Sequence, residues 1–234
     1  MSKPVKISSK IQPVNGVPDM QSKIELRQNQ TILFIGDSIT DAGRLEKAYR
    51  PLGYGYVHFV ANWLLAKNPE LNLNIINTGV SGNTIRNLKS RWERDCLNHK
   101  PDILSVMIGI NDVCRQHNNS LNDAVFHDEY ELTYKQLLSQ IKDNYNCQLV
   151  LMEPFLLCDN KENPVYNTLK DYIDTINGLA NQFDAILVPL QKTIDKKIKK
   201  IPPHFWSDDM IHPFLWAHAW IAQRWLEATE NSFE

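Results

Sequence analysis

Short runs of β-branched and aromatic residues alternate with helix-like segments from residue 31 onward, and this alternation constrains the fold more than any other feature of the sequence. Runs of this kind predict buried strands. The predicted strands are Thr31–Ile35, Leu73–Asn77, Ile103–Ile108, Gln148–Met152 and Ala185–Val188. Parallel strands need crossover connections, which the intervening helices supply. The sequence therefore predicts an α/β fold with a parallel sheet covered on both faces.

The segments between the strands show helical periodicity. In residues 56–67, for example, Val57, Val60, Ala61 and Leu64 fall on one face of a helix. Further helices are predicted over 84–97, 130–142, 169–180 and 213–228. Five parallel strands with right-handed crossovers favour a flavodoxin-like three-layer α/β/α sandwich with the strand order 2-1-3-4-5. In that order the first three strands are neighbours, so the residues that follow them emerge side by side.

A serine lies at the first of these strand ends. Gly36-Asp37-Ser38 directly follows the strand Thr31–Ile35, and the carboxyl edge of the sheet is where an α/β enzyme presents its reactive groups. Ser38 or Asp37 would also suit the cap of a following helix, and on this pentapeptide alone both interpretations stay open. Gly82 and Asn111 follow the second and third predicted strands, which places them beside Ser38.

Motifs carrying Ser, Gly, Asn and His in this order resemble those of the SGNH hydrolase family, also called GDSL esterases and lipases. They are Gly36-Asp37-Ser38-Ile39-Thr40, Val80-Ser81-Gly82-Asn83-Thr84, Gly109-Ile110-Asn111-Asp112 and Asp209-Met210-Ile211-His212-Pro213. The resemblance runs from Gln30 to Leu226. It is closer still to the intracellular acetylxylan esterase branch, through the residues from Phe34 to Asp41, Ser81-Gly82-Asn83-Thr84 followed by Arg91-Trp92-Glu93, and the residues from Met107 to Val113.

Ester hydrolysis by a serine needs a base, because a serine hydroxyl is a weak nucleophile until its proton is removed. His212 is the candidate base for Ser38. Asp209 lies three residues before His212, and this spacing lets its carboxylate reach a ring nitrogen and fix the tautomer. Asp208 competes for that role. The resemblance favours Asp209, because the family's Asp-x-x-His pattern matches it and does not match Asp208.

The resemblance also implies donors for the negative oxygen of the tetrahedral intermediate. These are the backbone N–H groups of Ser38 and Gly82 and the side-chain amide of Asn111. A glycine at position 82 would let the backbone approach the substrate closely. We further predict that Asp37 and Trp206 contribute to substrate binding. For Trp206, which lies in the loop before Asp209, simple loop packing is an open alternative.

Composition limits the remaining functions. The chain has 234 residues and is expected to form an N-terminal arm, 1–30, and one hydrolase domain, 31–234. A net charge of −2 gives no electrostatic case for binding nucleic acid or an anionic membrane. The N-terminus lacks the pattern of a secretory signal, and the four cysteines show no C-x-x-C spacing. We therefore expect a cytoplasmic protein with no metal and no cofactor. Assembly into a homo-oligomer is a further hypothesis.

The sequence-based prediction is a serine esterase that removes acetyl groups from small carbohydrate esters, xylo-oligosaccharides in particular, through an acyl-enzyme on Ser38. Two other interpretations stay open. One is a lysophospholipase or acyl-thioesterase of the same family, although the residues between Gly43 and Tyr56 are charged and offer little apolar surface for a long chain. The other is a catalytically silent binding protein on the same fold.

Overall fold

A five-stranded parallel sheet forms the centre of the molecule. The computed structural model describes residues 24–118 and 121–229. The strands, β1 (Thr31–Gly36), β2 (Asn74–Asn77), β3 (Ile103–Met107), β4 (Gln148–Met152) and β5 (Ile186–Val188), lie in the order β2-β1-β3-β4-β5. Every neighbouring pair is parallel. The predicted fold class and strand order are confirmed.

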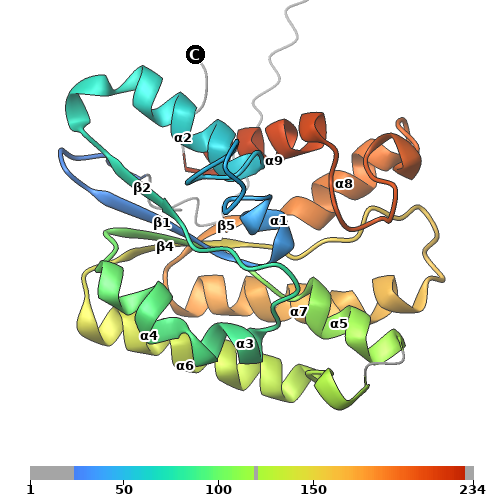
Figure 1. The fold of residues 1–234 in the computed structure, drawn as a ribbon. Helices are drawn as coiled ribbons and strands as arrows, with labels where there is room; N and C mark the ends of the chain where they lie inside the picture. Colours follow the sequence, from blue (N-terminus) through green and yellow to red (C-terminus); the bar gives the residue numbers. More distant parts are fainter. Residues whose placement is uncertain (1–23, 119–120, 230–234) are drawn as a thin grey trace, which may run out of the picture.

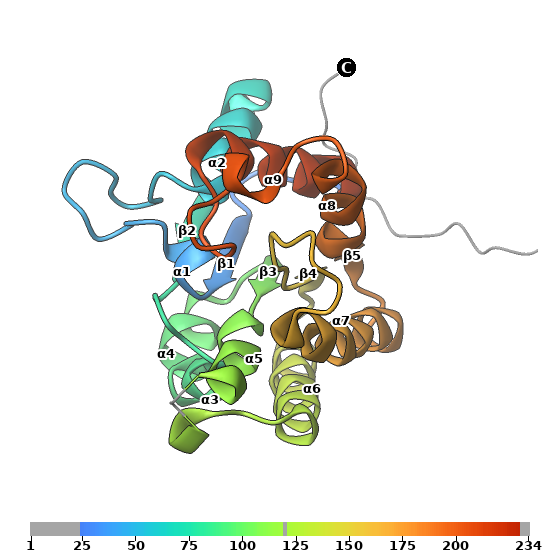
Figure 2. The ribbon, with the colours of Figure 1, turned by 90° about the vertical axis from the view of Figure 1, so that its right-hand side faces the viewer.

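Helices cover both faces of this sheet, which gives three layers (Figure 1). One layer holds α2 (Tyr56–Lys67), α8 (Leu190–Ile198) and α9 (Leu215–Ala228). The opposite layer holds α3 (Ile85–Ser90), α4 (Trp92–Asp95), α5 (Ile110–His117), α6 (His127–Asn144) and α7 (Pro164–Gln182). Figure 2 shows the sheet nearly end-on, with the short α1 (Ser38–Asp41) at the end of β1 and the loop that follows α1 projecting from the body of the molecule.

The core lies on both faces of the central strands. Ile32, Leu33, Phe34 and Ile35 of β1 are all 0 % exposed, because side chains on both sides of a parallel sheet are covered by helices. The ring of Phe34 packs against Tyr56 of α2 and Trp225 of α9. This packing fixes the strand that leads into Ser38.

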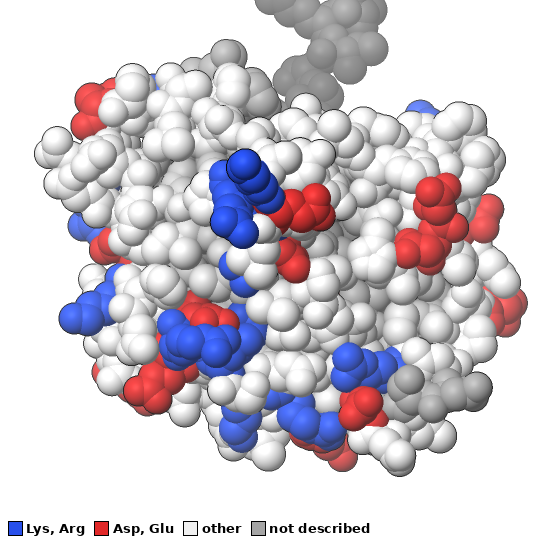
Figure 3. Space-filling model, viewed as in Figure 1, with Lys and Arg blue, Asp and Glu red and all other residues white. Residues whose placement is uncertain are grey.

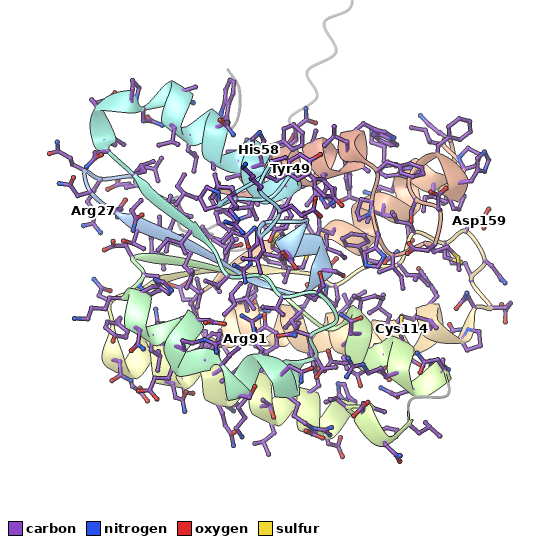
Figure 4. All side chains as sticks on the ribbon, viewed as in Figure 1. Arg27, Tyr49, His58, Arg91, Cys114 and Asp159 are labelled. Atoms are coloured by element: carbon purple, nitrogen blue, oxygen red, sulfur yellow. The ribbon has the colours of Figure 1, made fainter. Side chains whose placement is uncertain are left out.

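The predicted helix 84–97 is interrupted at Arg91, and the structure has two short helices in its place. Thr84 begins α3 with a capping box, in which its hydroxyl and the side chain of Asn87 satisfy each other's backbone N–H groups. Arg91 leaves the helical conformation, with φ −117° and ψ 7°, before α4 begins. The interruption directs the Arg91 side chain toward the sheet, below the ends of β1 and β2 (Figure 4).

The N-terminal arm predicted over 1–30 lies mostly outside the described residues. Its described part, 24–30, includes Ile24, which is 1 % exposed and belongs to the core. This part of the predicted arm therefore packs on the domain.

None of the helices in the described part of the chain combines the length and apolarity needed to cross a membrane. Basic and acidic side chains are interspersed over the face seen in Figure 3, without a broad field of one sign.

Candidate active site

Ser38, His212 and Asp209 form one hydrogen-bonded chain at the carboxyl end of β1. The hydroxyl of Ser38 lies 2.8 Å from Nε2 of His212. Nδ1 of the same ring lies 2.6 Å from Oδ2 of Asp209. An ionised carboxylate only accepts hydrogen bonds, so Nδ1 carries a proton and Nε2 is left to accept from the hydroxyl. The arrangement can take a proton from the serine.

The loop that carries Asp209 and His212 is organised around the Asp209 carboxylate. Its Oδ1 accepts hydrogen bonds from the Ser207 hydroxyl and from the backbone N–H groups of Ile211 and His212. Burial alone would raise the pKa of Asp209, but the hydrogen bonds from His212, Ile211 and Ser207 outweigh it and hold this pKa well below its ordinary value. The carboxylate is therefore ionised at neutral pH.

The neighbouring carboxylate, Asp208, is exposed. In the described chain no hydrogen bond or ion pair joins it to His212, whereas Asp209 makes both contacts. The hydrogen bond to His212 is therefore made by Asp209, which the Asp-x-x-His pattern favours, and not by Asp208.

Gly82 and Asn111 border the same cavity as Ser38 and His212. Gly82 has φ +77°, a conformation that favours glycine, and a Cβ there would meet nothing within 4 Å. Its backbone therefore faces open space and not a packed neighbour. Asn111, in the first turn of α5, donates one amide hydrogen to the carbonyl of Asn83 over 3.0 Å, which orients the amide and leaves its second hydrogen for a ligand.

Arg91 ties the 78–83 loop to the end of β1. Its guanidinium donates to the carbonyls of Gly36, 2.9 Å away, and Thr78, 2.6 Å away, and to the side chain of Asn83, 2.7 Å away. The residue is 7 % exposed. Although the Asp95 carboxylate partly offsets the effect, burial lowers the pKa of Arg91. Arg91 belongs to a motif seen in the sequence, but only the fold reveals that two strand ends surround it.

The outer side of the same loop is held by Asp41, Arg44 and Arg115. The Asp41 carboxylate accepts from the backbone N–H and hydroxyl of Ser81, at 3.1 and 2.7 Å. Arg44 donates to the carbonyl of Gly79, and Arg115 of α5 donates to the carbonyl of Gly82 over 2.7 Å. A sequence signal is weak here, because these contacts join segments that are far apart in the chain.

Asp37 does not line the cavity, which corrects its assignment to substrate binding. It is 1 % exposed, and its carboxylate accepts from the N–H of Ile39 as the cap of α1. Burial raises the pKa of Asp37 to about 7, against the lowering effects of the Ile39 hydrogen bond and of His212. Asp37 is therefore a buried capping residue of α1, the helix that begins at Ser38.

Trp206 is also placed differently from the sugar-binding prediction. Its side chain is 1 % exposed and packs against the rings of Trp216 and Trp220. Its indole N–H donates to the carbonyl of Ile201 over 3.0 Å. A buried ring with its one donor already used anchors the loop 206–213, so the alternative of loop packing is the one that the structure supports.

The cavity beside Ser38 and His212 has a volume of ≈ 600 Å³, which is within the range of small-molecule sites. Among residues 24–118 and 121–229, no group of three or more His, Cys, Asp or Glu side chains is arranged to hold a metal ion. The four cysteines are free thiols. The Ser38 hydroxyl, the His212 imidazole and the Asn111 amide all border the cavity.

A serine hydroxyl bound to an imidazole that is bound in turn to a carboxylate, at the carboxyl edge of a parallel sheet, defines the class of serine hydrolases. The model of the GDSL-like lipase/acylhydrolase family matches residues 34–219, and the chain belongs to this family. It is a carboxylic ester hydrolase.

Known relatives resemble the chain over nearly its whole length. An acetylxylan esterase of Geobacillus stearothermophilus is 36% identical over 217 residues, which cover 90% of this chain and 98% of the relative. The crystal structure of Axe2, an acetylxylan esterase from that organism, superposes with a TM-score of 0.84 at 35% identity and covers 90% of this chain and 98% of its own. LAE5, an α/β hydrolase from the metagenome of Lake Arreo in Spain, gives a TM-score of 0.83 at 33% identity, with 89% and 98% covered.

Proposed function

We propose that the protein is an acetylesterase that removes acetyl groups from xylo-oligosaccharides through an acyl-enzyme on Ser38. The observation that carries the proposal is the hydrogen-bonded chain from Ser38 through His212 to Asp209 at the border of the cavity. The similarity to acetylxylan esterases supports the choice of substrate. Solved structures of Axe2 include catalytic mutants in which a serine, an aspartate or a histidine is replaced by alanine.

In the first half of the reaction, the Ser38 oxygen attacks the acetyl carbonyl carbon while Nε2 of His212 accepts the hydroxyl proton. The carbonyl π electrons move to the oxygen. The N–H groups of Ser38 and Gly82 and the amide of Asn111 stabilise the resulting oxyanion. Each such donor contributes about 3–4 kcal/mol to the transition state in comparable sites. The intermediate then collapses: the bond to the sugar oxygen breaks, and His212 gives its proton to that oxygen.

In the second half, water attacks the acetyl group on Ser38 with His212 again accepting a proton. The Ser38 oxygen leaves and regains the proton from His212, and acetate is released. Asp209 stays ionised throughout and stabilises the imidazolium, which its low pKa allows. No step needs a metal ion.

The cavity supports a short acyl group over a long one. Outside the segment 43–54, the side chains that line it are those of Ser38, Asp41, Ala42, Ser81, Asn111 and His212, of which only Ala42 is apolar. A long alkyl chain would find little apolar surface there. The lysophospholipase and thioesterase interpretations therefore have no specific structural feature in their favour.

Acetate release from acetylated xylo-oligosaccharides tests the proposal. The wild-type protein is expected to release acetate, and Ser38→Ala is expected to lose at least about 10³-fold in kcat while keeping its melting temperature. Absence of acetate release by a folded wild-type protein that hydrolyses other esters would contradict the choice of substrate.

We also infer that the protein acts in the cytoplasm, since free thiols suit a reducing compartment. The division into an arm, 1–30, and a hydrolase domain, 31–234, and assembly as a homo-oligomer stay predictions. Limited proteolysis and light scattering test them.

A further inference from the structure

The cavity extends well beyond the reacting groups. Its far side is formed by the segment 43–54, here called the wall, which contributes Gly43, Leu45, Glu46 and Tyr54. An acetyl group occupies only a small part of ≈ 600 Å³. The remaining space lies between the Ser38–His212 pair and the wall, where the alcohol part of an ester would project. The side chains of the wall therefore decide which alcohol fits.

Tyr54 presents a ring that is held in place but still accessible. It is 40% exposed. Its ring makes edge-to-face contacts with Tyr49, at 5.3 Å between centroids, and with His218, at 6.0 Å. Its backbone N–H donates to the carbonyl of Ala42 over 2.9 Å. A ring fixed before binding loses little conformational entropy when a ligand packs against it.

Glu46 places a carboxylate beside that ring. A Cβ built on Gly43 would lie 2.9 Å from Oε1 of Glu46 and 3.2 Å from Cε1 of Tyr54, so both groups flank the same backbone position. Gly43 also has φ +71°, which favours glycine. In the described part of the chain, the Glu46 carboxylate has no hydrogen-bond or ion-pair partner. It is therefore available to accept hydrogen bonds from a ligand.

An aromatic ring next to a free carboxylate matches the two surfaces of a sugar. The C–H face of a pyranose is apolar and packs on an aromatic ring, and its hydroxyls donate to a carboxylate through charge-assisted hydrogen bonds. An alkyl alcohol part would use only the ring. A cationic alcohol part would use both the ring and the carboxylate, so the choice of a sugar also rests on the similarity to acetylxylan esterases. Asp41, the other carboxylate that lines the cavity, is already bound to Ser81, and Arg44 donates to the carbonyl of Gly79.

We propose that Glu46 and Tyr54 form a subsite for the sugar ring that carries the acetyl ester. The inference rests on the proposed function and makes it specific. The ring packs on Tyr54, and sugar hydroxyls donate to Glu46. The wall thereby controls the affinity for carbohydrate esters and takes no part in the bond-breaking steps.

Tyr49 of the wall and His58 of α2 lie near one another in Figure 4. Together with Tyr54 they border a second cavity of ≈ 500 Å³. Tyr54 lines both cavities, so the second cavity borders the proposed subsite residue as well.

Two esters with the same acyl group and different alcohols test the subsite. Acetylated xylotriose offers a sugar to the wall, whereas ethyl acetate has an alcohol too small to reach it. For Tyr54→Ala we expect kcat/KM to fall at least tenfold on acetylated xylotriose, mainly through KM, and to stay within twofold on ethyl acetate. Tyr54→Phe should retain most activity, and Glu46→Gln should lose three- to tenfold on the sugar ester alone.

Phe126→Ala is the matched control, because Phe126 is an exposed aromatic residue, 58% accessible, at the start of α6 in the opposite helical layer. It should leave both esters unchanged. Melting temperatures establish that each variant folds, and inhibition of ethyl acetate hydrolysis by xylotriose without acetyl groups should weaken in Tyr54→Ala.

An equal loss on both esters in Tyr54→Ala, or no loss on the sugar ester, would overturn the subsite. A wild-type protein that hydrolyses ethyl acetate but not acetylated xylotriose would overturn the proposed function and the subsite with it. The two failures are therefore distinguishable in one experiment.

Discussion

The two sides of the catalytic cavity are built on different principles. On one side, the carbonyls of the 78–83 loop are bound from beneath by Arg91 and from outside by Arg44 and Arg115. On the other side, the wall 43–54 presents exposed side chains, with Leu45 64% and Tyr54 40% accessible. The first side is fixed by hydrogen bonds to the backbone, and the second is defined by side chains that face solvent.

This difference separates reactivity from selectivity. Donors to an oxyanion are effective only when they are held in place before the reaction, which explains why so many contacts fix a short loop. A substrate subsite can be formed by exposed side chains. Replacing one of them changes substrate binding but does not move the backbone that holds the catalytic groups. Changes to the 78–83 loop should therefore lower the activity on every substrate equally. Changes to the solvent-exposed side chains of the wall, such as Leu45 and Tyr54, should discriminate among alcohols.

The largest loss of kcat is expected at the Asp209–His212 pair. No group on either side of the cavity can take over its role as base. Asp209→Asn should lower kcat by about 10³–10⁴-fold, because it favours the wrong tautomer and leaves the imidazolium unstabilised. Asp208→Asn, the adjacent control, should change kcat by less than threefold. Steady-state kinetics on ethyl acetate measure both, and similar losses in the two variants would refute the assignment of Asp209.

Removing Arg91 tests the fixed side. Arg91→Ala withdraws donors from the carbonyls of Gly36 and Thr78, so kcat should fall by about 10²-fold and to the same extent on ethyl acetate and acetylated xylotriose. Stability should fall by about 1–3 kcal/mol for each buried carbonyl left without a partner. Arg86→Ala is the control. Arg86 lies in α3, just before Arg91, but it makes an exposed ion pair with Glu129 of α6. A loss confined to the sugar ester would contradict the assignment of Arg91 to the catalytic groups, because that effect is the one expected for Tyr54.

The two sides also contain buried titratable groups with opposite pH dependence. Burial raises the pKa of Asp112, which binds the N–H of Ile85 beside the fixed loop, to about 7. Burial lowers the pKa of His218, which lies beneath Tyr54, to about 4. Folded Asp112 thus holds its proton more tightly than the unfolded chain does, and its contribution to stability is lost as pH rises from 4 through 7. Folded His218 resists protonation, and its contribution is lost as pH falls from 6.5 through 4.

Urea unfolding between pH 4 and 8 measures these opposite slopes. Relative to Asp112→Asn, the wild-type protein should lose stability toward high pH. Relative to His218→Gln, it should lose stability toward low pH, and each difference should reach roughly 2–4 kcal/mol. Parallel curves for wild type and either variant would show that the substituted residue does not titrate as its burial indicates.

The smallest effect concerns the acyl group. Acetyl esters of p-nitrophenol should be cleaved at least tenfold faster than octanoyl esters, as measured by kcat/KM, because the polar lining gives added methylenes little apolar surface. Tyr54→Ala should not reverse this order, since the wall is assigned to the alcohol. Faster cleavage of the octanoyl ester would favour a lipase or thioesterase.

Much of the fold could be predicted because it depends on local periodicity. The strand Gln148–Met152 and the helix Tyr56–Lys67 lie where the sequence predicts them, since each is marked by apolar residues at the spacing of its own type. The break at Arg91 could not be predicted in this way. Helical propensity continues through it, and what interrupts the helix is a buried guanidinium bound to two strand ends.

The residues of the candidate site also fall into two groups, those that short motifs predict and those that only the fold brings together. Ser38, His212 and Asp209 could be identified because they belong to short motifs with a chemical reason for their spacing. Asp37 is buried and does not contact the cavity, and for Trp206 the alternative of loop packing fits its burial. Residue type and loop position do not reveal burial. Tyr54 and Glu46 carry no motif, and their relation to Ser38 arises only when the wall folds over the end of β1.

Ser38 is proposed as the nucleophile and His212 as the base that activates it. A fluorophosphonate reacts with an activated serine to give a stable adduct, which intact mass and peptide mapping locate. We expect one adduct per chain on Ser38, none in Ser38→Ala, and labelling slowed by at least about 10²-fold in His212→Ala. An adduct on another residue, or undiminished labelling of Ser38 without His212, would contradict the account.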